Sequence, residues 1–136
     1  MKKADDIHRL LAKSADLILV IALSSMLYFP GVLIGAFYIL ISDGLFDGQS
    51  LGKKIFKIKT VFFDEDQHAK KAMFKQSVIR NGFLSVLIVF SAIPFLGYLV
   101  MFVLVLYLFV EGYFLIMDSK GIRIGDIYAQ TQVIDT

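Results

Sequence analysis

Cysteine is missing from this 136-residue sequence, so disulfide bonds and thiolate chemistry are excluded. The two histidines, His8 and His68, are isolated, and neither has a second ligand at metal-binding spacing. The sequence has no Ser/His/Asp set, no zinc motif and no nucleotide-binding loop. We therefore expect no metal, no other cofactor and no enzymatic activity.

Lysine and arginine are absent from two long stretches, residues 14–52 and 81–119. The 14 basic residues gather before residue 14, between residues 53 and 80, and after residue 119. The chain is 57% hydrophobic, whereas soluble domains contain about 45–50% apolar residues. Because basic residues concentrate in cytoplasmic loops, this pattern predicts a multi-pass protein of the inner (plasma) membrane. Both termini and the central segment are expected in the cytoplasm.

The apolar stretches predict one all-α membrane domain over residues 1–136, a bundle of four transmembrane helices in two hairpins. An aspartate inside the first stretch argues against a cleaved signal peptide. The second helix is short for a hydrocarbon core of about 30 Å. An amphipathic segment, residues 69–81, is expected to lie in the interface and continue into the third helix. The expected helices cover about residues 8–29, 32–46, 70–93 and 98–117, with outer turns at Pro30-Gly31 and at 94–97.

Two short segments alternate between polar and apolar residues, as half-buried strands do. The first is FKIKTVF, residues 56–62, and the second is YAQTQVI, residues 128–134. We expect them to pair as a small two-stranded β cap on the cytoplasmic side of the bundle.

Asp16 stands inside the first apolar stretch, two helical turns after Arg9 and on the same face as Lys13. A charge at that depth costs roughly 1–3 kcal/mol unless it is paired or hydrated. We therefore expect Asp16 to face the bundle interior near the cytoplasmic side, neutralised by Arg9, Lys13 or Arg80.

Further charged residues fall near the predicted cytoplasmic boundary. They belong either to a polar cavity that binds cations or protons or to a network of structural ion pairs that locks the bundle. The candidate set comprises Arg9, Asp16, Asp43, Arg80, Glu111 and Asp126. The outer half of the predicted bundle contains no ionisable side chain except tyrosines. Either a complete ion path runs between protomers of a homo-oligomer, or the site opens only inward, or no transport occurs.

The central segment carries four lysines after the second helix. Basic side chains at this position contact anionic lipid headgroups, each contributing about 1 kcal/mol. The expected headgroup contacts are Lys53, Lys54, Lys57 and Lys59. Nucleic acid is not an expected partner, because positive charge here follows from the membrane topology.

Five short motifs, in this order, resemble the RDD family of small bacterial membrane proteins. Arg9-Leu10-Leu11-Ala12 with Asp16 resembles its first motif, and Asp43 its acid near the end of helix 2. The family's T-x-G-K and alternating segment resemble residues 50–53 and 58–61, and Arg80-Asn81 matches its R-N. The final L-H-D-x-x-A-x-T motif resembles residues 124–131, with glycine at position 125 where the family usually has histidine.

The resemblance implies that Arg9, Asp16 and Asp126 are the residues for which the family is named. We expect Asp126 to dock under the bundle and contact Arg9 or another basic residue. Two functions are open. One is an oligomeric cation/proton transporter, a role proposed for some members, using Asp16, Asp43 and Glu111. The alternative is a non-transporting accessory protein that binds lipid or another membrane protein and whose charges form structural ion pairs.

Overall fold

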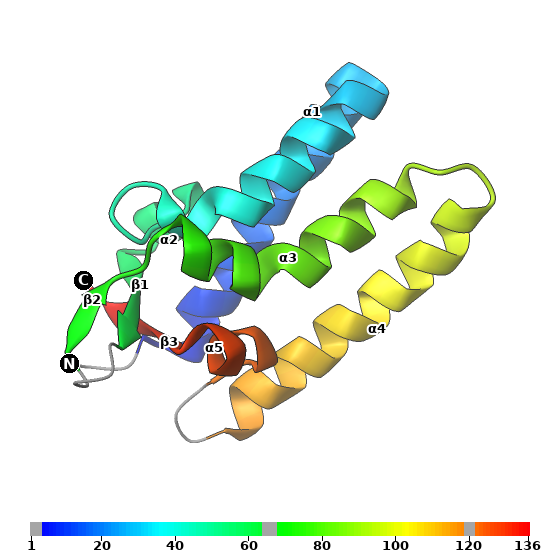
Figure 1. The fold of residues 1–136 in the computed structure, drawn as a ribbon. Coiled ribbons are helices and arrows are strands. Elements are labelled where there is room, and N and C mark those ends of the chain that lie inside the picture. Colours follow the sequence, from blue (N-terminus) through cyan, green and yellow to red (C-terminus); the bar gives the residue numbers. More distant parts are fainter. Residues whose placement is uncertain (1–3, 64–67, 119–121) are drawn as a thin grey trace.

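A computed structural model of the chain describes residues 4–63, 68–118 and 122–136. The fold is mostly helical, with a small sheet at one end from which the long helices extend (Figure 1). In chain order the elements are α1 (Asp6–Ile41), the 3-10 turn η1 (Ser42–Gly44), α2 (Leu51–Ile55), β1 (Ile58–Phe63), β2 (Ala69–Lys71), α3 (Phe74–Ser91), α4 (Leu96–Met117), α5 (Ile124–Ala129) and β3 (Thr131–Asp135).

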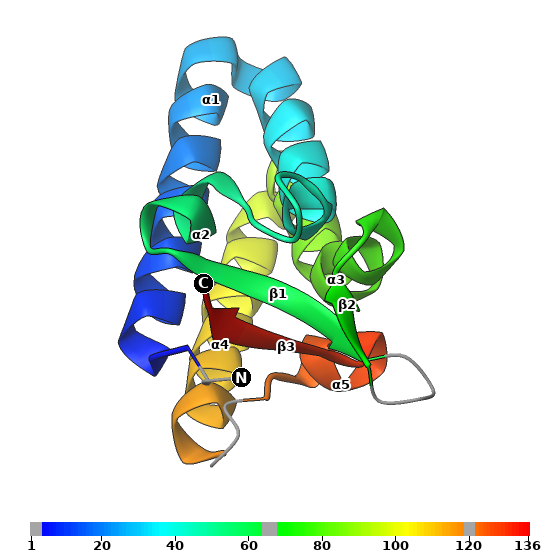
Figure 2. The ribbon, with the colours of Figure 1, turned by 90° about the vertical axis from the view of Figure 1, so that its left-hand side faces the viewer.

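Helix α1 is a hairpin of two arms rather than one straight rod (Figure 2). Tyr28 interrupts it with φ 52° and ψ −130°, two residues before Pro30. The predicted turn at Pro30-Gly31 therefore lies slightly too late in the chain. The arms pack closely because Gly35 has no side chain: a Cβ there would lie 2.6 Å from Val20 Cγ1.

The second arm of α1 ends at Ile41, so the predicted end of the second helix near residue 46 was wrong. The chain turns at η1 because α3 holds it there. The backbone N–H of Asp43 donates to Ser77 Oγ (3.0 Å), and the Ser77 hydroxyl donates to the carbonyl of Leu40 (2.8 Å).

Helix α3 begins at Phe74, so the prediction of helix from residue 70 was also wrong. Residues 69–71 instead form β2, which pairs antiparallel with β1. The side chain of Gln76 accepts a hydrogen bond from the backbone N–H of Met73 (3.1 Å), which fixes the start of the helix after the strand.

The predicted pairing of the two alternating segments is confirmed. Strands β1 and β3 are antiparallel, with a register from Ile58 opposite Asp135 to Phe62 opposite Thr131. The cap has three strands in the order β2-β1-β3 rather than two. Residues 128 and 129 belong to α5 and not to the strand.

Two apolar cores hold the fold together. The first core lies between the arms of α1 and α3 and consists of Val20, Ala36, Ile39, Leu84 and Ile88. The second core joins the N-terminal part of the chain to the sheet and consists of Ala4, Ala12, Ile58 and Val133.

Two described segments are long and apolar enough to cross a membrane, 6–44 and 96–117. Helix α4 matches the predicted helix 98–117 to within two residues.

Candidate functional site

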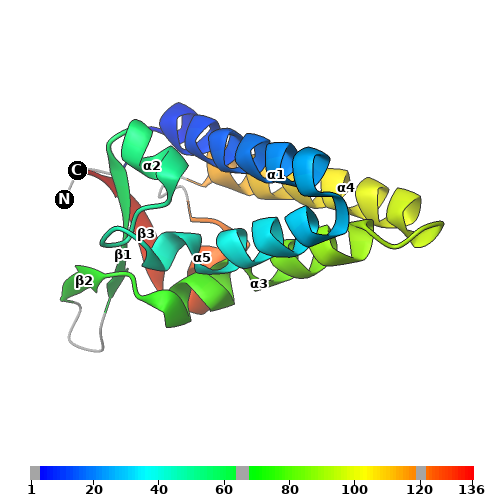
Figure 3. The ribbon, with the colours of Figure 1, turned by 90° about the horizontal axis from the view of Figure 1, so that it is seen from above.

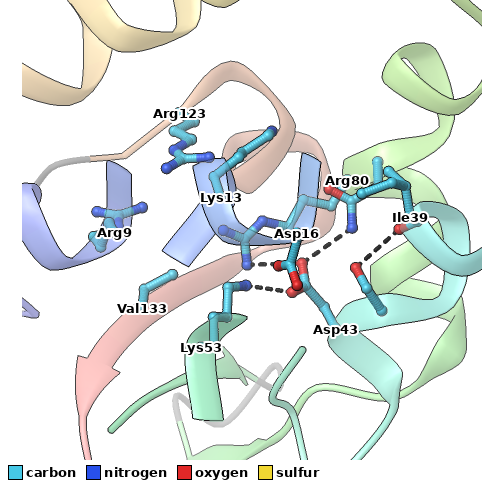
Figure 4. A pocket seen from close by; sticks show the side chains of 11 residues that line it. Arg9, Lys13, Asp16, Ile39, Asp43, Lys53, Arg80, Arg123 and Val133 are labelled. Atoms are coloured by element: carbon cyan, nitrogen blue, oxygen red, sulfur yellow. Dashed lines mark hydrogen bonds and ion pairs between the residues drawn. The ribbon is translucent and has the colours of Figure 1, made fainter. Parts of the chain in front are cut away.

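The buried charges meet where the long helices join the sheet (Figure 4). They surround a cavity of about 30 Å³, which is room for about one water molecule. Cationic side chains outnumber carboxylates in its lining. The charged lining consists of Arg9, Lys13, Lys53, Arg80 and Arg123, with Asp16 and Asp43.

Asp126 is the most completely enclosed carboxylate of the cluster, with a side chain that is 0% exposed. Arg9 Nη2 donates to its Oδ2 (3.0 Å), and Arg80 Nε lies 2.6 Å from its Oδ1. The hydroxyl of Thr131 and the backbone N–H of Arg123 also donate to it (3.3 and 3.2 Å). The expected contact between Asp126 and Arg9 is thus present, and it ties α5 to α1 across 117 residues of sequence.

Asp43 occupies η1, at the end of the second arm of α1. The ammonium of Lys53 binds its Oδ1, while Asn81 Nδ2 donates to its Oδ2 (3.1 Å) and Arg80 Nη1 lies 3.3 Å from that oxygen. Arg80 therefore bridges Asp43 and Asp126, and it links the helical hairpin to the C-terminal tail.

Asp16 does not meet the cations expected to neutralise it. Its Oδ1 accepts hydrogen bonds from the Tyr38 hydroxyl (2.6 Å) and the Gly52 N–H (2.9 Å), and its Oδ2 accepts one from the Ser50 hydroxyl (2.5 Å). No ion pair joins it to a described lysine or arginine at 4 Å or less. Several donors to one carboxylate can stabilise its charge without a cation. Asp16 thereby fixes α2 against α1.

The residues of the T-x-G-K-like segment each have a structural role. Ser50 caps α2 through a hydrogen bond from the Lys53 N–H (3.2 Å) while its hydroxyl donates to Asp16. Gly52 lies so close to α1 that a Cβ would be 2.1 Å from the carbonyl oxygen of Ala12. The segment therefore joins α1, η1 and the sheet.

Glu111 on α4 faces two cations. Lys13 Nζ donates to its Oε2 (2.8 Å), and Arg123 Nη1 lies 3.6 Å from its Oε1. These contacts connect α4 to the first arm of α1 and to the residue before α5. All six residues of the candidate set, Arg9, Asp16, Asp43, Arg80, Glu111 and Asp126, are buried.

The expectation that Lys53 contacts lipid headgroups was wrong. Its side chain is 12% exposed and turns inward, where it binds Asp43 and donates to Thr60 Oγ1 (2.7 Å). The neighbouring Lys54 is exposed and lies over the ring of Phe46, 4.6 Å from its centroid. Headgroup contact stays a prediction for Lys54, Lys57 and Lys59, of which the first two are exposed and the last is half-buried.

Burial, together with the nearby positive charge of Arg80, lowers the pKa of Lys53 to about 7, although Asp43 opposes this shift. The unfolded chain then binds a proton at Lys53 between about pH 7 and its ordinary pKa of 10.5, and the folded chain does not. We expect the free energy of unfolding to rise with pH over this window, by at most about 1.4 kcal/mol per pH unit. Chemical denaturation in detergent micelles at pH 7.5 and 9.5 measures the rise.

Lys53→Met should remove this part of the pH dependence, with Lys54→Met as the control for loss of a lysine side chain. If wild type and Lys53→Met show the same slope, Lys53 does not release a proton in this range.

The sequence did not predict several residues of the charge network. Arg123 was counted only as cytoplasmic charge, Lys53 was expected to contact lipid headgroups, and Tyr38, Ser50 and Asn81 were only parts of predicted helices or motifs. The structure also gives a physical reason for the glycine at position 125, where the RDD family usually has histidine. A Cβ at Gly125 would lie 2.6 Å from the carbonyl oxygen of Arg80, so this chain leaves no room there for the usual histidine.

The comparisons with known proteins agree with the motif pattern. The sequence profile of the RDD family matches residues 7–130, which is nearly the whole chain. Neither the search of curated proteins nor that of solved structures gave a match. The matched region includes the arginine at position 9 and both aspartates, Asp16 and Asp126. The chain therefore belongs to the RDD family.

Proposed function

We propose that this chain is a non-transporting accessory protein of the inner membrane, with four membrane crossings and both termini in the cytoplasm. Its buried charges serve as a structural network that fixes the cytoplasmic cap to the helices. In this role the apolar surfaces bind lipid or another membrane protein.

The observation that carries the proposal is that donors engage every carboxylate in the network. Asp16 binds three hydroxyl or amide donors, and Asp43, Glu111 and Asp126 each contact cationic side chains. Among the described residues no group of three or more acids or histidines is arranged to hold a metal ion. A transported cation would have to displace these donors inside a cavity of only about 30 Å³.

The packing beyond the network supports the same role. The buried core between α1 and α3 consists of aliphatic side chains, Val20, Ala36, Ile39, Leu84 and Ile88, of which Ile39 also lines the charged cavity. Serine hydroxyls in this region donate hydrogen bonds to backbone carbonyls: Ser24 donates to the carbonyl of Val20, and Ser91 donates to the carbonyl of Ile88. A cation crossing this layer within one protomer would meet no charged group among the buried core residues that the structure describes.

A second candidate is proton-coupled transport, the hypothesis that the buried acids first suggested. Lys53 favours it, because a buried lysine with a pKa near 7 and a carboxylate partner can exchange a proton near neutral pH. The path for that proton would run through an oligomer interface.

Proteoliposomes with an imposed pH gradient separate the two candidates. With Na⁺, Li⁺ or K⁺ added, we expect wild-type protein to dissipate the gradient no faster than empty liposomes do. The same result is expected for Asp16→Asn, Glu111→Gln and Lys53→Met. Cation-dependent proton flux in wild type that Glu111→Gln or Lys53→Met abolishes, while the variant stays folded by circular dichroism, would overturn the accessory role and support transport.

A further inference from the structure

The first arm of α1 and helix α4 lie alongside each other (Figure 3). Side chains of both helices line a groove along the seam between them. Its larger part, about 490 Å³, is mostly apolar, and Ile88 and Ser91 of α3 also line it. Its smaller part, about 140 Å³, contains charged groups. Leu17 and Leu108 line both parts, so the two parts adjoin along the seam.

The groove changes from polar to apolar along its length. Lys13, Ser14, Glu111 and Arg123 line the end near the charge network. Val20, Ile21, Met101 and Leu104 line the other end. An occupant that fits this groove has a charged head and an apolar tail.

The charge at the polar end favours an anion. Lys13 and Arg123 share a single carboxylate, Glu111, at 2.8 and 3.6 Å, which leaves one net positive charge there. The side chain of Arg123 is 6% exposed, and its Nε has no hydrogen-bond acceptor among the described residues. A phosphodiester carries one negative charge and several acceptor oxygens, so it complements this end.

The length of the groove matches one leaflet of a bilayer. Its lining on α1 runs from Leu10 to Ser25, and the stretch from Lys13 to Ser24 rises about 16 Å. The hydrocarbon core is about 30 Å thick, so this is roughly half of it. A lipid of the cytoplasmic leaflet would have its head at the network and its tail toward the midplane, the same direction as the gradient of polarity.

A helix of another protein fits the groove less well. One turn of helix, taken as a cylinder of about 10 Å diameter and 5.4 Å pitch, occupies about 420 Å³. The apolar part, about 490 Å³, would therefore admit only about one turn. An acyl chain is thinner and flexible, and it is available wherever the protein lies in a membrane.

We propose that the seam between α1 and α4 binds one anionic phospholipid, with its phosphate at Arg123 and Lys13 and an acyl chain along the apolar part. The proposal deepens the accessory role and rests on its membrane location, but it does not depend on the absence of transport.

Gly112 gives a sharp test, because it lines the polar part of the groove and a Cβ there would meet nothing within 4 Å. Gly112→Leu would therefore fill the groove without a clash at the backbone. Gly82 is a matched control: it also lies inside a long helix, a Cβ there meets nothing within 4 Å, and it lies outside the groove.

Native mass spectrometry of the full chain, released from detergent after mixing with dioleoylphosphatidylglycerol or dioleoylphosphatidylcholine, measures the binding. We expect wild type and Gly82→Leu to retain one phosphatidylglycerol, at least tenfold more tightly than phosphatidylcholine. Gly112→Leu should lose that binding at least tenfold. Arg123→Gln should lose the preference for phosphatidylglycerol, with circular dichroism confirming that each variant is folded.

Three outcomes would overturn the proposal. One is equal retention of the two lipids by wild type. Another is undiminished phosphatidylglycerol binding by a folded Gly112→Leu variant. The third is a dimer without retained lipid that Gly112→Leu disrupts, which would assign the groove to a helix of a second chain. Flux in phosphatidylcholine proteoliposomes bears on the accessory role alone, so the two proposals can fail separately.

Discussion

Replacing Asp126 with asparagine is expected to lower the free energy of unfolding by about 3–5 kcal/mol, because removing one partner of a buried ion pair leaves the other charge uncompensated. Two arginines lose a carboxylate contact in this variant, since Arg9 and Arg80 both contact Asp126 at 3.0 Å or less, and Arg80 keeps its contact with Asp43 at 3.3 Å. Because Asp126 lies on α5, the same substitution should also release the C-terminal tail. Chemical denaturation in mixed micelles measures the first effect, and limited trypsin digestion near the C-terminus measures the second.

Asp47→Asn is the matched control for this substitution. Asp47 pairs with Lys71 at 3.0 Å, but the two side chains are 76% and 64% exposed. Exposed pairs contribute about 0–1 kcal/mol, so this variant should stay close to wild type. Equal losses for the two variants would mean that Asp126 does not hold the tail through a buried pair.

Gly52→Ala is expected to destabilise the protein by about 2.5–6 kcal/mol. The added Cβ would lie 2.1 Å from the carbonyl oxygen of Ala12, which is backbone and cannot rotate away. Separating α2 from α1 costs about 1–3 kcal/mol through overpacking. It also breaks the hydrogen bond from the Gly52 N–H to Asp16 (2.9 Å), and bonds to charged groups contribute about 1.5–3 kcal/mol. The same denaturation measurement reports the sum.

Gly82→Ala should have the opposite sign. A Cβ at Gly82 meets nothing within 4 Å, and alanine is better than glycine inside a helix by roughly 0.5–1 kcal/mol. If Gly52→Ala were as stable as Gly82→Ala, α2 would not be pressed against α1, and the glycine of the T-x-G-K-like segment would have another role.

The predictions for Asp126→Asn and Gly52→Ala both depend on which groups stabilise the carboxylates of Asp126 and Asp16. Asp126 depends on guanidinium groups from α1 and α3, whereas Asp16 depends on hydroxyl and amide donors from α2 and from the second arm of α1. The two aspartates that the motif resemblance identifies, Asp16 and Asp126, are therefore not equivalent. One docks the tail, and the other docks α2.

The sequence by itself determined the features that local patterns encode. Apolar runs bounded by Pro30 and Pro94 located the long helices, and alternation in residues 56–62 and 128–134 located the two strands that pair. Motif order pointed to the RDD family, which the profile match confirmed. These features follow from periodicity and polarity, which short segments display without knowledge of their partners.

Only the tertiary structure decided which charge meets which. A lysine after a membrane helix looks the same in sequence whether it faces lipid or a buried acid, and Lys53 faces Asp43 because α2 folds back against α1. The sequence indicated that the negative charge of Asp16 must be stabilised, but not by which groups. Its hydrogen-bond donors come from Tyr38, Ser50 and Gly52, which are 22 to 36 residues away in the chain. Strand β2 likewise forms where the sequence suggested a helix, because β1 offered an open edge. Partner choice depends on segments far apart in the chain, and the folding of the whole molecule sets it.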